Sequence, residues 1–511
     1  MKLLFVRTPR RYWQYVNLDD NFWMPLSYPC LASVVRQRIP DLQIKMIDCC
    51  ALQIGWKTFE QRIMEEKPDF FGTGDETLYA DEGERAARLA KKANPDCVTI
   101  GGGRHYPFLP ELYLGPDKPF DYLVFGEGEL TFAELIEELS KENPRPENVK
   151  GILYHDGEKV VRTPFRPVVD DLDTLPMPAY DMMHPESYGQ KGRLWAFRNS
   201  IPVQHSRGCV SSCTFCSFWP AESPWKLVDG KPTPYSCYRT KSAGLMVDQM
   251  EQLYKDYGAR QFNWVDGTWN VNPKWNEAWA DEVIRRKMKF GWFAFMRADF
   301  ILRDEKLEIF GKLVEAGLNF VLIGAERADP EDLEGLKKRN YGDDASIRAM
   351  RLIRKKYPQV WVQCTYIMGF PEETRESMLG LLEHAFKSKT CFPGYHFITP
   401  MPGTQLWEEA HEKGWIVDED FRNYDWFNPI IRCNNMSREE MMQLFHNMTR
   451  DFIVKSPQYY YGLFSPHSIK RNLYWWFWLV GFKFLIARIK SRFSESSEGY
   501  LSSTKPGWYD T

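Results

Sequence analysis

Three cysteines stand close together in the segment HSRGCVSSCTFCSF, residues 205–218. Cys209, Cys213 and Cys216 follow a C-x3-C-x2-C spacing, so their thiolates can converge on one inorganic centre. Iron–sulfur clusters are bound by cysteine thiolates, normally four, and three ligands therefore leave one iron of a 4Fe–4S cluster free. The alternative is a zinc site that His205 or a distant residue completes. The spacing favours the cluster.

An aromatic residue, Phe215, directly precedes the last cysteine. A C-x3-C-x2-C segment with an aromatic residue at this place resembles the signature of radical S-adenosylmethionine (SAM) enzymes. The resemblance implies that the free iron binds the amino and carboxylate groups of SAM. It also implies that an electron from the cluster cleaves SAM to methionine and a 5′-deoxyadenosyl radical. The electron would come from an external donor such as a flavodoxin or ferredoxin.

The composition is that of a globular protein. A length of 511 residues, with 43% hydrophobic residues, is enough for two or three domains. A net charge of −3 gives no indication of nucleic acid as a partner. Apart from the triplet and the Cys49–Cys50 pair, the eleven cysteines are scattered, which argues against a disulfide scaffold. The first apolar run is too short for a signal peptide, and free thiolates fit a reducing cytoplasm.

Residues 1–165 alternate short apolar runs with helical patterns. Five strand–helix units predict a doubly wound parallel sheet, in which ligands bind outside the carboxyl ends of the strands. Apolar runs on both sides of Asp156 and Gly157 predict a β-hairpin at the end of this region. The candidate strands cover residues 2–6, 43–48, 69–73, 97–101 and 121–125.

Glycine-rich and polar segments come where these strands end, and glycine lets a bulky ligand approach the backbone. No G-x-G-x-x-G dinucleotide fingerprint follows the first strand. Together with the cysteine triplet, the set resembles the cobalamin-binding domain of one radical SAM subclass. The resemblance implies cobalamin contacts from Thr73, Gly74, Thr77, Gly101, Gly102, Gly103, His105, Gly126, Glu127, Gly128 and Glu129.

Two of these positions bear on how cobalamin would be held. Thr77 lies where the family often has a hydroxyl facing the displaced dimethylbenzimidazole. His105 is a candidate near the cofactor tail, although a lone histidine is more often a structural hydrogen-bonding residue. The chain has no D-x-H-x-x-G pattern, so we expect base-off cobalamin without a protein histidine on cobalt.

A proline- and aspartate-rich segment predicts a linker over residues 166–196. From 197 to 415, strand and helix patterns alternate again. About six βα units predict a partial (β/α)6 barrel, whose catalytic groups lie at the carboxyl ends of the strands. A helix is predicted over residues 305–316, and the candidate strands cover residues 201–204, 261–265, 290–296, 319–323, 359–368 and 395–398.

The ends of these strands resemble the SAM-binding segments of the same family. Asp266, Gly267 and Thr268 stand where the family often has a segment for the SAM amino group. Arg297 is a candidate for the SAM carboxylate, because arginine binds carboxylates in a bidentate way; the alternative is a salt bridge at the rim. Glu326 resembles the position near the SAM ribose, and Gly369 begins a turn like the one beside the adenine.

Residues 416–511 are rich in aromatic residues and predict a mainly helical extension. An apolar run near residues 473–486 is too short and too interrupted for a membrane-spanning helix. Tryptophan and tyrosine beside cations suit a membrane interface, and the alternative is a helix docked on the barrel. The interpretation slightly favours peripheral membrane contact through residues 470–492, with the cations Lys470, Arg471, Lys483, Arg488, Lys490 and Arg492.

The resemblance implies a cytoplasmic enzyme that uses a 4Fe–4S cluster, SAM and cobalamin, and the C-terminal region allows it to associate with a membrane surface. We expect the enzyme to methylate an unactivated carbon of an apolar, lipid-like small molecule. One alternative is an anaerobic oxidative cyclase that acts on a tetrapyrrole ester. A non-catalytic cobalamin or metal sensor, or a zinc-binding structural protein, would belong to a different functional class.

Overall fold

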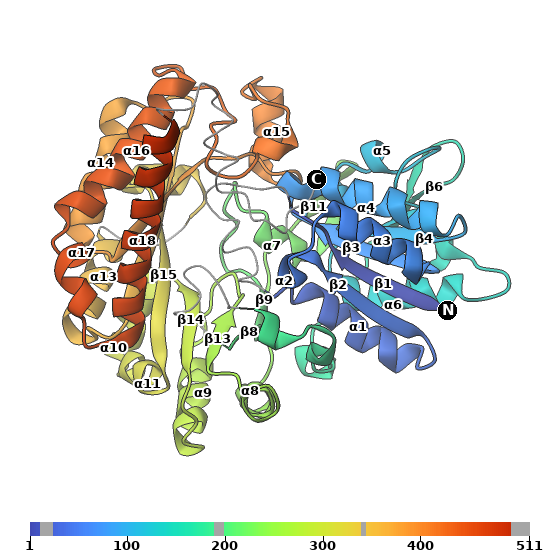
Figure 1. Ribbon diagram of the computed structural model, residues 1–511, viewed down its shortest axis with the longest axis horizontal. Coiled ribbons are helices and arrows are strands. Elements are labelled where there is room, and N and C mark those ends of the chain that lie inside the picture. The colour runs from blue at the N-terminus through green and yellow to red at the C-terminus, as the bar shows by residue number, and fades with distance from the viewer. Residues whose placement is uncertain (11–23, 189–198, 339–343, 492–511) are drawn as a thin grey trace.

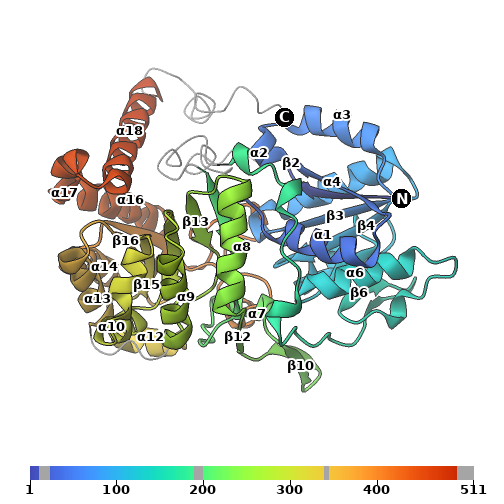
Figure 2. The ribbon, with the colours of Figure 1, turned by 90° about the horizontal axis from the view of Figure 1, so that it is seen from below.

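Two sheets flanked by helices form the body of the molecule in a computed structural model of the chain (Figure 1). The structure describes residues 1–10, 24–188, 199–338 and 344–491. Helix α8 (Ala243–Asp256) stands between the two sheet regions in the turned view (Figure 2). This arrangement confirms the predicted α/β fold class.

The first sheet has the strand order β2-β1-β3-β4-β5-β6-β7, and β1 to β5 run parallel. The chain changes direction between β1 and β3, which is the switch point where doubly wound sheets bind ligands. The last two strands form the expected antiparallel hairpin on the edge. The strands are β1 (Lys2–Arg7), β2 (Gln43–Asp48), β3 (Phe70–Asp75), β4 (Val98–Gly103), β5 (Tyr122–Val124), β6 (Ile152–His155) and β7 (Val160–Arg162).

Helices cover both faces of this sheet, each over its own apolar core. One core holds Phe59, Ile63 and Ala87 of α3 and α4, and the other holds Val35 and Ile136 of α1 and α6. Burying both faces is what a parallel sheet requires. The helices are α1 (Ser27–Arg38), α2 (Cys49–Leu52), α3 (Trp56–Glu66), α4 (Ala80–Ala93), α5 (Pro110–Tyr113) and α6 (Gly128–Leu139).

The second sheet has six parallel strands in sequential order, with β8 and β17 at its edges. Such an order, with helices outside, is that of a partial (β/α) barrel. The strands are β8 (Ser200–Val203), β13 (Gln261–Trp264), β14 (Gly291–Met296), β15 (Leu318–Glu326), β16 (Trp361–Met368) and β17 (Phe392–Phe397). Besides α8, the helices are α9 (Pro273–Arg285), α10 (Ala298–Lys306), α11 (Ile309–Glu315), α12 (Pro330–Gly335), α13 (Ala345–Lys356) and α14 (Arg375–Ser388).

The helix predicted over residues 305–316 is wrong in its extent. The structure has two helices there, α10 and α11, and the first begins at Ala298. Glu308 between them has a φ of 60°, in the left-handed region, which interrupts the helical hydrogen bonds. The apolar spacing on which the prediction rested continues across both helices, because both bury their faces in the same core.

A segment that the strand pattern did not predict lies between β8 and α8. It carries β9 (Ser206–Gly208), α7 (Phe218–Ala221), β10 (Trp225–Val228), β11 (Lys231–Pro234) and β12 (Tyr238–Thr240). β9 pairs with β12 and β10 pairs with β11, both antiparallel. Two of the four residues of β11 are prolines, which are rare in strands, so the sequence did not predict this strand.

The chain ends in helices that pack on the barrel. α16 (Arg438–Lys455) contacts α14, and α18 (Ser468–Ser491) places Tyr474 5.0 Å from the ring of Trp361 at the start of β16. α15 (Gln405–Glu412) and α17 (Gln458–Tyr461) complete the extension. Among the helices of the described residues, none is long and apolar enough to span a membrane.

Candidate active site

The three cysteines lie in the loop that follows β9. Gly208, the last residue of β9, has a φ of 77°, and a Cβ atom there would come 2.2 Å from the carbonyl oxygen of Cys237. Glycine is therefore needed for the chain to turn into Cys209. Ser211 N–H donates to Cys209 Sγ at 3.4 Å, and Trp219 Nε1 donates to the carbonyl of Cys213 at 3.0 Å.

The chemistry of these thiols fits an iron–sulfur cluster. All three are free and partly exposed, and burial raises the pKa of Cys213 to about 12 and also raises that of Cys216. A thiolate in such surroundings needs positive charge beside it, and a coordinated metal provides that charge and removes the thiol proton. In the described residues, no three His, Cys, Asp or Glu side chains are gathered around a single ion position.

His205 has other partners than the cysteines. Its Nδ1 lies 2.8 Å from Asp266 Oδ1, its Nε2 lies 3.4 Å from Tyr238 Oη, and its ring stacks on Trp275 at 4.0 Å between centroids. Both ring nitrogens are therefore engaged by protein groups. This geometry does not support His205 as the fourth ligand of a zinc site.

The segment after β13 lies directly beside the cysteine loop. Thr268 Oγ1 is 3.6 Å from Cys209 Sγ, and a Cβ atom on Gly267 would lie 3.8 Å from the carbonyl oxygen of Gly208. Asp266 is fully buried, and its Oδ1 accepts hydrogen bonds from the backbone N–H groups of His205 and Ser206. Asp266 thus holds the backbone that leads into the loop. Of the three residues of this segment, Thr268 is the one whose side chain contacts Cys209.

Arg297 follows β14 and reaches the cysteine loop. Its Nη1 donates to Ser211 Oγ at 2.6 Å, and its Nε and Nη2 donate to Asp299 at 3.0 and 2.9 Å. The backbone N–H of Arg297 donates to Asn270 Oδ1, which fixes the turn. The predicted carboxylate-binding arginine therefore lies at the loop, and one carboxylate, that of Asp299, already contacts its guanidinium.

The ends of β15 and β16 carry two of the expected residues. Glu326 has a φ of 63°, and Lys338 Nζ lies 2.6 Å from its Oε1. A non-glycine residue in this region stores strain, which is common at functional sites. Gly369 has a φ of 83°, and its N–H donates to Glu373 Oε2 at 3.1 Å. Glu373 also pairs with Arg327, so a buried ion pair braces this turn.

In the first sheet, the glycines of β3 and β4 lie side by side. Thr73 pairs with Gly101 and Gly74 with Gly102. A Cβ atom on Gly102 or on Gly126 would meet nothing within 4 Å, so bare backbone faces open space there. The side chain of Leu123, by contrast, leaves no room for a Cβ atom on Gly101. The strand ends therefore fit a bulky cofactor such as cobalamin at some of the predicted positions.

Thr77 and His105 contact each other behind these strand ends. His105 Nδ1 lies 3.2 Å from Thr77 Oγ1 and its Nε2 lies 2.7 Å from Tyr113 Oη. Burial lowers the pKa of His105 to about 3, so the ring is neutral. Both nitrogens are engaged, which agrees with the structural interpretation of this histidine.

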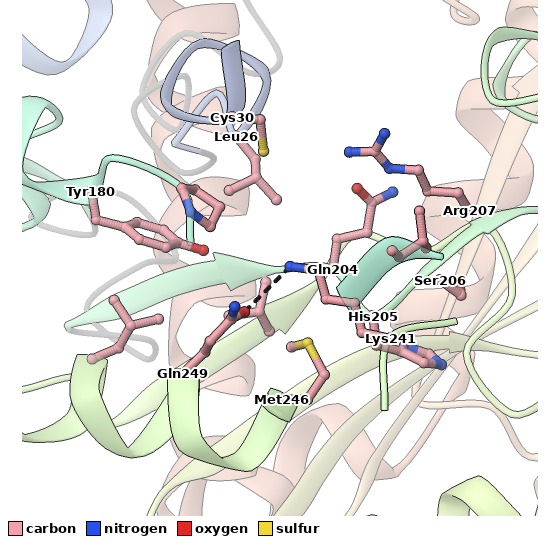
Figure 3. Close-up of a pocket in the computed structure, with 14 residues that line it drawn as sticks. Leu26, Cys30, Tyr180, Gln204, His205, Ser206, Arg207, Lys241, Met246 and Gln249 are labelled. Carbon is pink, nitrogen blue, oxygen red and sulfur yellow. Dashed lines mark hydrogen bonds between the residues drawn. The ribbon is translucent and has the colours of Figure 1, made fainter. Parts of the chain in front are cut away.

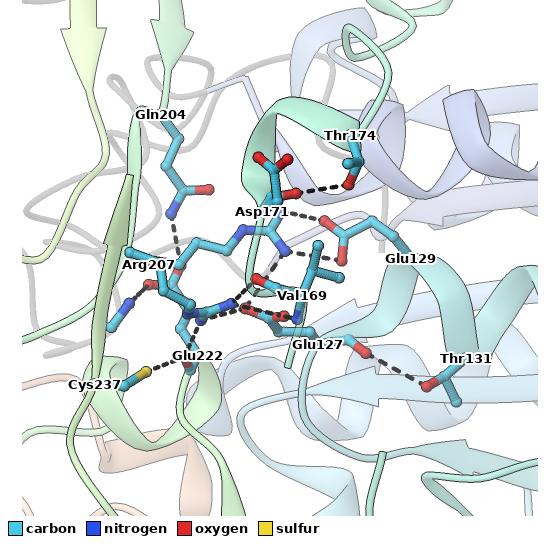
Figure 4. A network of polar contacts seen from close by, with 12 residues as sticks. Glu127, Glu129, Thr131, Val169, Asp171, Thr174, Gln204, Arg207, Glu222 and Cys237 are labelled. Atoms are coloured by element: carbon cyan, nitrogen blue, oxygen red, sulfur yellow. Dashed lines mark hydrogen bonds and ion pairs between the residues drawn. The ribbon is translucent and has the colours of Figure 1, made fainter. Parts of the chain in front are cut away.

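The carboxylates of the Gly126–Glu129 segment are engaged by the barrel. Arg239 Nη2 lies 2.7 Å from Glu127 Oε1, and Arg207 pairs with Glu129 (Figure 4). Glu127 also accepts a hydrogen bond from the backbone N–H of Val169 in the linker at 3.0 Å. Both carboxylates thus link the first sheet region to the second through arginines, and the cobalamin contacts implied for Glu127 and Glu129 stay predictions.

Several residues that build this site were not expected from the sequence. Ser211 lies in the loop and accepts from Arg297, and Lys338 binds Glu326 at the end of β15. Arg207, Arg239 and Glu222 bind the flanks of the loop or the segment after β5. Glu222 Oε2 accepts a hydrogen bond from the N–H of Gly208 at 2.9 Å. The partners of Arg207 and Arg239 are distant in sequence, and of these residues only Arg207, within the cysteine segment, could have been noticed from the sequence.

Two family models match the chain in this order. The B12 binding domain matches residues 19–136, and the radical SAM superfamily matches residues 203–385. The match of the second begins at β8 and includes the cysteine loop, and the match of the first includes the glycine-rich ends of β3 and β4.

Two curated proteins of similar sequence are named for two different activities, methyl transfer and ring closure. An uncharacterized methyltransferase, PH0819, from Pyrococcus horikoshii is 28% identical over 451 residues, 88% of this chain and 92% of that protein. The anaerobic magnesium-protoporphyrin IX monomethyl ester cyclase of Rubrivivax gelatinosus is 28% identical over 465 residues, 89% of this chain and 78% of that protein.

A solved structure shares the fold. The cobalamin-dependent S-adenosylmethionine radical enzyme OxsB, with aqua-cobalamin and S-adenosylmethionine bound, superposes with a TM-score of 0.68 at 15% identity. The likeness covers 98% of this chain and 74% of that one. It extends over both sheets.

Proposed function

The chain belongs to the cobalamin-binding radical SAM enzymes, and we propose that it methylates an unactivated carbon of an apolar, lipid-like substrate. When bound, the cluster and SAM would supply the radical chemistry that removes a hydrogen atom, and cobalamin would supply the methyl group. Cys209, Cys213 and Cys216 would hold the cluster. The residues of the chain otherwise position these groups and exclude water from them.

One observation carries this proposal: the cysteine loop meets the carboxyl ends of the first sheet. Arg104, just after β4, lies with its guanidinium 3.9 Å from the ring centroid of Phe218, two residues after Cys216. Arg207, two residues before Cys209, pairs with Glu129 just after β5. A radical source and a methyl carrier must act on the same carbon atom, and contact between these two edges supports such an arrangement.

The apolar nature of the substrate is supported by a surface on the C-terminal helices. Phe464 is 82% exposed and Phe482 is 61% exposed, and other large apolar side chains are exposed beside them. We call this the aromatic patch; it consists of Tyr460, Tyr461, Phe464, Trp475, Trp478, Leu479 and Phe482. Aromatic side chains of this kind suit the interface of a bilayer, from which a lipid-like substrate would be taken.

The cations of this region require a correction. Lys470 is only 4% exposed, so it does not face lipid head groups. Arg471 Nη1 donates to the carbonyl of Ser465 at 2.9 Å. Arg492 lies outside the described residues. The inner face of α18 docks on the barrel through Leu473 and Tyr474, so the helix combines a buried face with an exposed one.

Anaerobic turnover tests the proposed reaction. The purified protein with reductant, SAM carrying a labelled methyl group, and candidate lipids and tetrapyrroles is analysed by mass spectrometry. The proposal predicts 5′-deoxyadenosine together with a product that carries the label. A ring-closed or oxygenated tetrapyrrole without label would instead support the cyclase activity named for one of the similar proteins. Absence of 5′-deoxyadenosine with every substrate would support a non-catalytic sensor.

A further inference from the structure

The inner face of the barrel sheet is partly exposed at β15, β16 and β17. Side chains alternate between the two faces of a sheet along each strand. On β16 the outer residues Val362, Cys364 and Tyr366 are fully buried in the core under the helices. The inner residues Gln363 and Thr365 are partly exposed. A complete (β/α)8 barrel is filled by its inner side chains, so the six strands here leave inner positions open that a closed barrel would cover.

Two polar side chains on this face converge on one point. Gln363 of β16 and His396 of β17 lie on neighbouring strands, and Gly394 lies beside them on the same face. A Cβ atom on Gly394 would lie 3.1 Å from His396 Nε2 and 3.7 Å from Gln363 Nε2. Both nitrogens therefore border the space that a side chain at position 394 would occupy, and glycine leaves that space to another group.

Neither of these side chains has a hydrogen-bond partner among the residues that the structure describes. The ring of His396 packs on Phe427, at 5.3 Å between centroids, which satisfies neither of its nitrogens. The polar pair at the other end of the same face differs, because Asn319 Nδ2 donates to Gln261 Oε1 at 2.8 Å. Polar groups inside proteins are nearly always hydrogen-bonded, so His396 and Gln363 indicate a partner that the described chain does not supply.

The chemistry of the two side chains suits a neutral oxygen atom. Burial lowers the pKa of His396 to about 4, so its ring is neutral. A neutral imidazole has one N–H donor and one acceptor nitrogen, and a glutamine amide has groups of both kinds. The cation beside this face, Lys338, is paired with Glu326 Oε1 at 2.6 Å. A hydroxyl or carbonyl group therefore fits better than a charged one.

Apolar side chains lie beside the two polar ones. Leu322 of β15 stands opposite Gln363 in the sheet register, and Phe295 of β14 stands opposite Leu322. On the other side of Gln363 stands Phe392 of β17. All three apolar side chains are partly exposed. A mainly apolar molecule with one polar group would therefore meet both kinds of surface on this face.

The pocket between α1, the linker and the first barrel strands shows the contrast. Lys241 and Gln249 line it, and Lys241 Nζ donates to Gln249 Oε1 at 3.3 Å (Figure 3). Arg207, also in its lining, pairs with Glu129. The charged groups of that pocket are thus bound by the chain itself, whereas the polar groups on the inner face of β16 and β17 are not.

We propose that His396 and Gln363 form a binding subsite for a hydroxyl or carbonyl oxygen of the substrate, whose apolar part lies against the apolar side chains beside them. This inference rests on the proposed function, and it adds one polar group to the apolar substrate. Thr365, two residues after Gln363 on the same face, donates to Glu326 Oε2 at 3.3 Å. The subsite therefore adjoins the position predicted for the ribose of SAM.

Protection of His396 from chemical modification tests the subsite. The probe is 1-octanol, an apolar chain with one hydroxyl, added to the cluster-loaded protein in the presence of SAM. Diethyl pyrocarbonate modifies accessible histidine side chains, and mass spectrometry locates the label. We expect octanol to slow the labelling of His396 and to leave that of the exposed His411 unchanged. Octanol binding needs no radical chemistry, so a lack of 5′-deoxyadenosine in the turnover assay would contradict the proposed function and leave this result standing.

Gln363→Met separates hydrogen bonding from apolar contact. Methionine keeps the length of the side chain and removes its amide, so the octanol concentration that gives half-protection should rise about fivefold, for the loss of one neutral hydrogen bond. Gln443→Met, at an exposed glutamine of α16, is the matched control and should show no rise. The proposal is overturned if octanol does not protect His396, if His396 is already unlabelled before octanol is added, or if Gln363→Met is protected at the same concentration as the wild type.

Discussion

Arg207 Nη1 donates to Glu129 Oε2 at 3.2 Å, across 78 residues of sequence and between the two sheets. Both side chains are about nine-tenths buried. Burial alone would raise the pKa of Glu129, but the charge of Arg207 and its hydrogen bonds more than offset this, so the pKa is lowered. This pair links the segment after β5 to the strand that leads into the cysteine loop.

Removing one member of this pair should destabilise the protein strongly. Arg207→Met leaves Glu129 buried without a counter-charge, which typically costs about 3–5 kcal/mol. Chemical unfolding measures the change. Arg36→Met, in an exposed pair with Asp181, is the control and should cost at most about 1 kcal/mol. Equal effects of the two variants would show that the buried pair does not join the domains.

Acidification should destabilise the chain through His105. Its pKa in the folded protein, about 3, lies below the ordinary value of 6.5. The unfolded state therefore binds the proton first, so this contribution to stability is complete above pH 6.5 and is lost as the pH falls toward 3. Between pH 6.5 and 5 the loss is about 2 kcal/mol for one such group.

His105→Gln should reduce this dependence on pH. Unfolding by denaturant between pH 6.5 and 5 measures it, and His411→Gln, at an exposed histidine, is the control. The absorbance spectrum of bound cobalamin should be the same in His105→Gln and wild type, because the ring nitrogens contact Thr77 and Tyr113. A shifted spectrum would indicate that His105 binds cobalt.

Arg297→Lys should weaken the binding of SAM. Lysine keeps the charge but loses the planar fork that holds a carboxylate, and losing one hydrogen bond to a charged group lowers affinity by about tenfold or more. Equilibrium binding of SAM to the cluster-loaded protein measures this. Arg303→Lys, whose guanidinium donates to the backbone carbonyls of Asn270 and Val271, is the control. Unchanged affinity in Arg297→Lys would show that Arg297 does not bind SAM and serves only its contacts to Ser211 and Asp299.

The aromatic patch should bind lipid vesicles. Replacing Trp475, Leu479 and Phe482 together with serine removes exposed apolar surface and leaves the docked residues Leu473 and Tyr474 in place. Co-sedimentation with vesicles that contain anionic lipid should fall. Leu227→Ser with Val228→Ser, at exposed positions of β10, is the control. Binding that persists in the triple variant would remove the patch as the contact surface.

The strands and the order of the two sheets could be predicted because buried parallel strands are continuous apolar runs that end in glycine or polar residues. The ion pairs of Glu127 and Glu129 could not be predicted, because their partners Arg207 and Arg239 come 78 to 112 residues later. Lys470 looked like a surface cation because the sequence does not show which side of α18 docks. The break at Glu308 was hidden by apolar spacing that is continuous through it.

The cluster site likewise has one part that the sequence reveals and another that only the fold reveals. The spacing of Cys209, Cys213 and Cys216 indicates the centre from the sequence alone, because the ligands come from a single loop. The contacts that hold this loop, from Arg297 to Ser211 and from Thr268 to Cys209, could be recognised only after folding.

Iron content and electron paramagnetic resonance of single cysteine variants test the central claim most directly. After anaerobic reconstitution and reduction, alanine at Cys209, Cys213 or Cys216 should each abolish the 4Fe–4S signal and the formation of 5′-deoxyadenosine from SAM. Cys237→Ala, at the free cysteine that packs against Gly208, should keep both. A wild-type protein that binds zinc and no iron, or a triplet variant that retains the signal, would contradict the account.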